Sequence, residues 1–115
     1  MPKTTIIYYT TVNNKVPFAD FLDSLQKSQQ TKLLRILAHL EEYGLPAIIP
    51  HTRKLANTPF WEIRILGNDN LRVIYVVVYQ ESILILHGFV KKSQKTPEKE
   101  ISVAIARYQD WQTRS

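Results

Sequence analysis

Residues 60–90 read FWEIRILGNDNLRVIYVVVYQESILILHGFV, and this stretch decides the fold. It contains three runs rich in β-branched and aromatic residues, FWEIRIL, LRVIYVVV and ILILHGFV, which is the composition typical of strands. The segment GNDN at 67–70 is a strong hairpin signal between the first two runs, and a turn at 81–82 leads into the third. These residues predict three consecutive antiparallel strands.

The first half of the chain adds a strand and two helices. Residues 4–11 (TTIIYYTT) predict a first strand. Pro17 fits the first position of a short helix, and a second helix is predicted from about residue 28 to Tyr43, ending at Gly44. The apolar stripe of the first helix contains Phe18, Phe21, Leu22 and Leu25, and that of the second contains Leu33, Ile36, Leu37 and Leu40.

A last helix is predicted to begin at residues 96–98 (TPE), where a hydroxyl cap, a proline at the first position and an acid in the first turn coincide. Segment 45–59 contains three prolines and is predicted to be a loop. The apolar face of the last helix contains Ile101, Ala104, Ile105 and Tyr108.

The predicted element order is β-α-α-β-β-β-α, which describes an α+β fold. We expect a small, mostly antiparallel sheet with a helical hairpin and a C-terminal helix packed on one face. The other face of such a sheet is open to solvent or to a partner. The length is that of one domain, so residues 1–115 are expected to form a single unit.

The composition limits the class of protein. The chain contains no cysteine, so neither a disulfide framework nor a thiolate metal site is available. The N-terminal residues MPKTTIIYYTT lack the long apolar core of a signal peptide. The longest uncharged apolar stretch, 73–79, is too short to span a bilayer. We therefore expect a soluble protein in the cytoplasm.

The net charge of +5 is unevenly distributed along the chain. Residues 1–50 carry five basic and four acidic side chains, whereas residues 51–115 carry ten and six. A localised basic surface favours a polyanionic partner, most often nucleic acid. The alternative is a soluble protein that is basic without such a partner.

Strand side chains alternate between two faces, and this places arginines together on one of them. Glu62 and Arg64 share a face of the first run, and Arg72 is on the corresponding face of the second. If the hairpin register pairs Arg64 with Arg72, the two guanidinium groups face each other, which is unfavourable unless an anion lies between them. The spacing alone fits two independent, solvated arginines equally well.

His87 lies in the third run, where alternation places it with Ile83, Ile85 and Phe89 on the core side. A histidine in an apolar strand is more often a structural residue than a catalyst, and both roles stay open here. Gly88 indicates a bulge or a close backbone approach, and a bulge would redirect the side chains that follow it.

The chemistry that the sequence offers is cationic. The sequence contains no Gly-rich phosphate loop, no metal-ligand spacing and no nucleophile turn, so neither metal catalysis nor a cofactor is expected. The remaining cations suit metal-free RNA cleavage, in which the 2′-hydroxyl attacks the adjacent phosphate and fixed positive charge stabilises the transition state. These cations are Arg53, Lys54, Arg64, Arg72, Lys91, Lys92 and Lys95.

Four motifs carry a family resemblance: WEIR (61–64), LRVIY (71–75), LHGFVKKSQKTP (86–97) and EIxxA (100–104). In this order and spacing they resemble the RelE/ParE toxin superfamily, specifically its HigB-like, phage-associated branch. The resemblance covers nearly the whole chain, from FLDSL in the first predicted helix to the last helix, and the predicted element order agrees with it.

The resemblance implies a toxin of a type II toxin–antitoxin system, an endoribonuclease that cleaves mRNA, often within the translating ribosome. It also implies a cognate antitoxin, a helix-turn-helix DNA-binding protein that neutralises the toxin. Basic residues of the superfamily contact and activate the phosphate, and the matching positions here are Arg64, Arg72, Lys91 and Lys92.

The predicted site combines this resemblance with the inventory of cations. Glu62 stands where RelE-type members have a basic residue, so it is either a proton acceptor or an ion-pair partner for an arginine. The role of a C-terminal tyrosine in some members is not transferred to Tyr108, because periodicity places that side chain on the buried face. We assign catalysis to Arg64, Arg72, Lys92 and His87, and RNA binding to Arg53, Lys54, Lys91 and Lys95.

Two other functions remain open at the level of sequence. A ParE-like inhibitor of DNA gyrase shares the fold and acts by binding a protein. A non-catalytic RNA- or protein-binding module would carry the same basic surface. The K-K-x-x-K run at 91–95 and the arginine pair favour RNA over gyrase.

Overall fold

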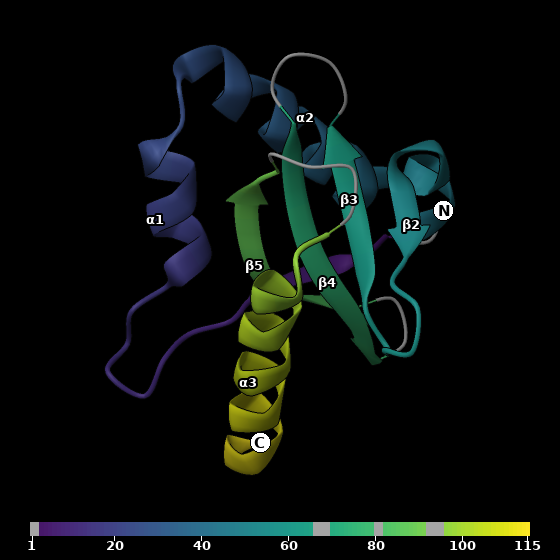
Figure 1. Ribbon diagram of the computed structural model, residues 1–115. Coiled ribbons are helices and arrows are strands. Elements are labelled where there is room, and N and C mark those ends of the chain that lie inside the picture. The colour runs from purple at the N-terminus through teal and green to yellow at the C-terminus, as the bar shows by residue number, and fades with distance from the viewer. Residues whose placement is uncertain (1–2, 66–69, 80–81, 92–95) are drawn as a thin grey trace.

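The computed structural model describes residues 3–65, 70–79, 82–91 and 96–115. The strands form one sheet in the order β1-β5-β4-β3-β2, in which β1 is parallel to β5 and the other neighbours are antiparallel (Figure 1). This confirms the α+β class with a mostly antiparallel sheet. The strands are β1 (Thr5–Tyr8), β2 (Thr52–Lys54), β3 (Trp61–Ile65), β4 (Leu71–Tyr79) and β5 (Ser82–Val90).

The helices begin and end where local chemistry favours it. Pro17 occupies the start of α1, and Gly44 ends α2 with a φ of 85°, a conformation that favours glycine. The turn predicted at 67–70 lies largely outside the described residues, and so does the first residue of the turn at 81–82. The helices are α1 (Pro17–Ser24), α2 (Lys27–Tyr43), the 3₁₀ helix η1 (Leu45–His51) and α3 (Glu98–Arg114).

Helices cover both faces of the sheet, so the expectation of helices on one face is wrong. The helices α1, α2 and η1 pack on one face, and α3 packs on the other (Figure 1). The reason is that both faces of β4 and β5 are apolar and each needs a cover. The core under α1 and α2 includes Phe18, Leu33, Leu37, Leu40 and Val73, and the core under α3 includes Phe60, Ile74, Val76, Leu86 and Ala104.

Segment 45–59 contains regular structure, so its prediction as a loop is wrong. Residues 45–51 form η1, and residues 52–54 form the edge strand β2, which pairs with β3. A 3₁₀ helix tolerates proline in its first turn, and the short β2 is stabilised by pairing with β3 and not by its own sequence. The strand places Arg53 directly opposite Glu62.

The apolar faces of the helices were predicted with one error. Phe18 and the three leucines of α2 are buried as expected, but Ile105 of α3 is 39% exposed. The buried stripe of α3 continues instead through Ala104 to Tyr108 and Trp111, which pack against Phe60 and Tyr79. No helix in the described part of the chain is long and apolar enough to cross a membrane.

Candidate functional site

Three central strands bring two arginines together on the face that α3 covers. Arg64 of β3 is directly opposite Arg72 of β4, which is the register that the sequence left open, and Phe89 of β5 is opposite Arg72 on its other side. Arg72 is almost fully buried, with 4% of its surface exposed, while Arg64 is partly exposed. Two guanidinium groups therefore share one end of the sheet.

Glu62 lies one cross-strand row away from the arginine pair. It is completely buried, and its strand neighbour on β2 is Arg53. The carboxylate Oε1 is 3.7 Å from Nε of Arg72, so the two form an ion pair without a hydrogen bond. This geometry favours the ion-pair role for Glu62 over the role of a proton acceptor, because no water reaches the carboxylate.

The other oxygen of Glu62 accepts a hydrogen bond from Thr96, the residue that the sequence predicts as the cap of the last helix. The Thr96 hydroxyl donates a 2.6 Å hydrogen bond to Oε2 of Glu62, and Thr96 is itself buried. Thr96 is therefore not the cap of α3; Pro97 occupies the capping position without a side-chain hydrogen bond. The predicted cap is wrong because the hydroxyl is directed to the buried carboxylate. A hydrogen bond to a charged acceptor is stronger than one between the hydroxyl and a neutral backbone N–H group of the helix end.

The axis of α3 points away from the arginine pair. The helix starts next to Glu62, continues past His87, which contacts Glu100, and ends near Tyr79, which contacts Trp111. It thus runs away from the end of the sheet at which Arg64 and Arg72 lie (Figure 1). Of the two arginines, Arg64 is the one with a partly exposed side chain, because Arg72 is almost fully buried.

Three buried polar atoms of this cluster have no hydrogen-bond partner within the described ranges. They are Oε1 of Glu62, Nε of Arg64 and Nε of Arg72. Buried polar groups in folded proteins are normally paired, and a buried unpaired donor is costly. Arg64 and Arg72, which are cross-strand neighbours, thus each have a buried Nε donor without a hydrogen-bond partner in the described part of the chain.

Burial and like charge perturb the cations of this cluster. Burial lowers the pKa of Arg72, and Arg64 adds to that effect, while Glu62 opposes it. Burial also lowers the pKa of Lys91, which is 4% exposed, and the charges of Arg72, Arg64 and Arg53 act in the same direction against Glu62. Lys91 thus belongs to the cluster electrostatically and gives up its proton more readily than an ordinary lysine.

His87 is on the α3 face, so its predicted place with Ile83 and Ile85 is wrong. The register of β4 and β5 shifts between Ile74, which pairs with His87, and the next residue of β4, which pairs with Ile85. This bulge precedes His87 and turns it toward α3, whereas the sequence had indicated a bulge at Gly88. The ring Nε2 lies 2.7 Å from Oε1 of Glu100, and Nδ1 lies 3.2 Å from NH1 of Arg107.

Both ring nitrogens of His87 are therefore engaged with α3. Burial lowers the pKa of His87 and the Arg107 charge adds to this, whereas Glu100 opposes it. The neutral ring satisfies both contacts, donating from Nε2 to Glu100 and accepting at Nδ1 from Arg107. These contacts favour the structural role for His87.

The remaining predicted residues fall into two groups. Arg53 is on the same sheet face as Glu62 and influences Lys91. Lys54 is directed to the other face, opposite Trp61, and its ammonium donates to the carbonyl of Thr58. Lys92 and Lys95 lie outside the described residues.

The comparison with known families extends over most of the chain. The family described as Phage derived protein Gp49-like (DUF891) matches residues 20–109, from α1 to α3. The chain is a member of the Gp49-like family. This family falls in the RelE/toxin-like class and is associated with toxins that pair with an antitoxin. No curated protein matches the chain.

The sequence did not indicate the contact of Thr96 with the buried cluster or the burial of Lys91. Thr96 had a complete local explanation as a helix cap, so nothing pointed to a partner 34 residues away. The sequence predicts RNA binding for Lys91 as a member of a basic run, in which adjacent lysines look equivalent. Burial distinguishes Lys91 from an ordinary surface lysine.

Across the described residues, no group of three histidine or carboxylate side chains is placed to hold a metal ion.

Proposed function

We propose that this Gp49-like toxin is a metal-independent mRNA endoribonuclease of the HigB-like branch, acting on translating ribosomes in the cytoplasm. A cognate antitoxin of the helix-turn-helix class neutralises it. The observation that carries the proposal is the pair Arg64 and Arg72, opposed across β3 and β4 with both Nε donors unpaired.

The arginine pair would bind the scissile phosphate. Each guanidinium offers a fork of donors that matches two phosphate oxygens. In the transition state the phosphorus carries an extra oxygen and more negative charge, so donors fixed in advance by the sheet stabilise it more than the ground state. The ion pair with Glu62 holds Arg72 in place for this purpose.

Cleavage requires two proton transfers. The 2′-oxygen loses a proton and forms a bond to phosphorus, the bond from phosphorus to the 5′-oxygen breaks, and that oxygen gains a proton. The products are a 2′,3′-cyclic phosphate and a 5′-hydroxyl. Lys91, whose pKa is lowered by burial and by neighbouring arginines, is our candidate to protonate the 5′-oxygen. Lys92 is adjacent in sequence and remains a candidate for contact with the same phosphate.

In this proposal neither Glu62 nor His87 accepts the proton of the 2′-hydroxyl. Glu62 is enclosed by Thr96 and Arg72, and His87 is held by Glu100 and Arg107. A solvent molecule or a ribosomal group would then accept the proton. This supports cleavage that depends on the ribosome.

The test is cleavage of a defined mRNA by the purified protein, with and without ribosomes, followed by mapping of the new 5′ ends. Arg64→Ala and Arg72→Ala should each reduce cleavage by about 10²–10³-fold. Lys27→Ala, which removes an exposed cation at the start of α2, is the matched control. Circular dichroism verifies that each variant is folded.

Two results would contradict the proposal. Intact mRNA under all conditions, with translation unaffected and double-strand DNA breaks accumulating, would indicate a gyrase inhibitor. Binding of mRNA without cleavage, and growth unaffected by expression, would indicate a non-catalytic module.

A further inference from the structure

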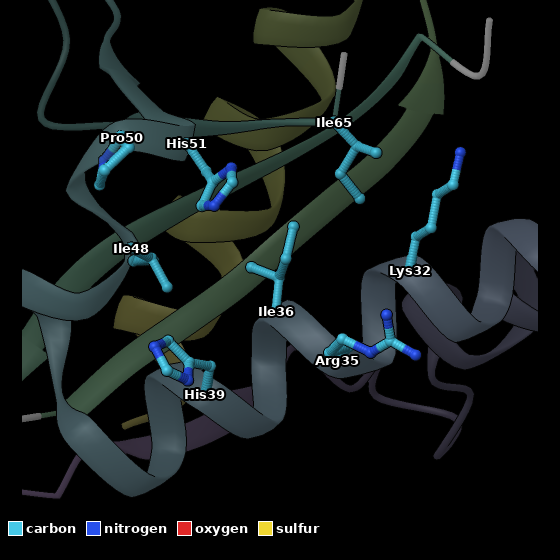
Figure 2. Close-up of a pocket in the computed structure, with 8 residues that line it drawn as sticks. All are labelled: Lys32, Arg35, Ile36, His39, Ile48, Pro50, His51 and Ile65. Atoms are coloured by element: carbon cyan, nitrogen blue, oxygen red, sulfur yellow. The ribbon is translucent and has the colours of Figure 1, made fainter. Parts of the chain in front are cut away.

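A pocket of about 610 Å³ lies between α2, η1 and the end of β3 (Figure 2). Its volume is within the range of about 300–1,000 Å³ that is typical of ligand sites. Ile65 of β3 contributes to it, whereas the neighbouring Arg64 is directed to the α3 face. The pocket is therefore on the opposite side of the sheet from the arginine pair.

The lining of this pocket has an apolar floor and a basic rim. Ile36, Ile48 and Ile65, with Pro50 beside them, provide the apolar part (Figure 2). The polar side chains around it are Lys32, Arg35, His39 and His51, and none of the lining residues that the structure describes is acidic.

The arrangement follows from the sequence of α2. Lys32, Arg35, Ile36 and His39 have the spacing i, i+3, i+4 and i+7, which places them along one stripe of the helix. The stripe adjoins the one that packs into the core through Leu33, Leu37 and Leu40. Ile36 is partly buried against the core, whereas Lys32, Arg35 and His39 are exposed and form a basic surface beside it.

We propose that this pocket binds an acidic amphipathic segment of the antitoxin, with one or two apolar side chains on the isoleucine floor and carboxylates at the basic rim. The identity of the partner rests on the proposed function. Amphipathic helices bind grooves in this way, and opposite charges at a rim set the register of the partner and accelerate its association.

The floor of the pocket favours a peptide over RNA. Unpaired bases are usually bound by stacking on aromatic rings or on guanidinium planes. Here the floor is made of branched aliphatic side chains and a proline, which offer no flat surface for a base; the planar groups of Arg35, His39 and His51 lie at the rim. An aliphatic side chain from a partner would pack well against them.

The test uses a synthetic peptide as the probe. The peptide has leucines at helical i, i+4 and i+7 spacing and glutamates flanking them; a matched peptide has lysines in place of the glutamates, and a single-stranded RNA oligomer is the third probe. Fluorescence anisotropy measures binding to the full chain, and backbone amide NMR shifts locate it. We expect binding of the acidic peptide only, with shifts centred on residues 32–39 and 48–51.

Variants make the location specific. Arg35→Glu and Ile36→Ala should each weaken binding of the acidic peptide at least tenfold. Lys27→Glu changes the charge of α2 equally but lies outside the pocket, so it should leave binding unchanged. The Ile36 side chain is partly exposed, and its replacement by alanine removes no charge. Ile36→Ala therefore tests the apolar floor without changing the basic rim.

Three results would overturn the inference: equal binding of the acidic and basic peptides, no effect of Arg35→Glu, or RNA binding that Arg35→Glu abolishes. The last result would assign the pocket to nucleic acid. The assay contains no mRNA substrate and measures no cleavage, so its failure is distinct from failure of the proposed nuclease activity.

Discussion

The Thr96 hydroxyl and the Glu62 carboxylate are joined by a 2.6 Å hydrogen bond between residues 34 positions apart. The bond connects the segment that leads into α3 with the second residue of β3. Because the same carboxylate pairs with Arg72, the docking of α3 and the position of the guanidinium are coupled through one buried acid. Loss of this bond should therefore affect both folding and the proposed site.

Thr96→Val removes the hydroxyl at nearly constant volume and leaves Oε2 of Glu62 buried without its donor. We expect the free energy of unfolding to fall by about 1–3 kcal/mol, which is the cost of an unsatisfied buried acceptor. Urea denaturation measures it. Thr96→Ser keeps the hydroxyl and should retain most of the stability; equal stability of the valine and wild-type proteins would show that the bond contributes nothing.

Arg64→Met tests whether the arginine pair is an anion site. Opposed like charges cost about 0.2–1 kcal/mol in a sheet, and an anion between them removes that cost. Inorganic phosphate should therefore raise the melting temperature of the wild-type protein more than that of Arg64→Met, while the variant without phosphate is at least as stable as the wild type. Differential scanning fluorimetry at constant ionic strength measures both.

The control for Arg64→Met is Lys27→Met, which removes an exposed cation away from the pair. Its response to phosphate should match that of the wild type. An equal phosphate response in Arg64→Met would mean that phosphate binds elsewhere.

Lys91→Met tests the proposed acid. The variant keeps the length of the side chain but can transfer no proton, so cleavage should fall by about 10²–10⁴-fold. Lys99→Met, at an exposed position of α3, should cleave normally. If single-turnover cleavage by Lys91→Met equals that of the wild type, Lys91 carries no proton.

The strands with strong local signals were predictable, whereas the contacts between elements were not. Alternation in 60–90 placed Arg64 and Arg72 on one face, which the structure confirms, whereas the register that pairs them was left open by the sequence. In contrast, β2 is only three residues long and depends on pairing with β3, so its own sequence carries no pattern that indicates it.

The errors at the site have the same physical origin. A bulge shifts strand register by one residue, and the position of the bulge beside His87 is set by packing on both faces of β5. Likewise, burial is what distinguishes Lys91 from a surface lysine and Glu62 from a solvated acid, and burial depends on where α3 docks.

His87 should make stability depend on pH in the acidic range. Its folded-state pKa is lowered from the ordinary value of 6.5, so below 6.5 the unfolded chain binds more protons than the folded protein. The stability associated with the neutral ring is therefore complete above 6.5 and is lost as the pH falls through 6.5 toward the lowered folded pKa. Urea denaturation across this window should show a smaller decrease for His87→Gln than for the wild type.

An NMR titration of the His87 ring provides a direct check on the same prediction. The ring should titrate below 6.5 in the folded protein. A value at or above 6.5 would mean that the contact with Glu100 outweighs burial and the charge of Arg107, and stability would then increase on acidification.

Gly88 is required because α1 approaches the backbone of β5. A Cβ built at this position would lie 2.7 Å from Cε2 of Phe21, closer than real side chains come. Gly88→Ala should therefore force the ring or α1 to shift and should lower the free energy of unfolding by about 1–3 kcal/mol, as overpacking does in well-packed cores. Chemical denaturation measures the change.

The matched test for Gly88→Ala combines it with Phe21→Ala, which removes the ring atoms that the new methyl group meets. If the clash is the cause, the double variant should be more stable than the sum of the two single effects, with a coupling free energy of about 0.5–3 kcal/mol. Strict additivity would place the cost of Gly88→Ala in the strand backbone. Since α1 contacts β5 at this point through Phe18 and Phe21, a positive coupling would also show that α1 is held to the sheet by this close approach.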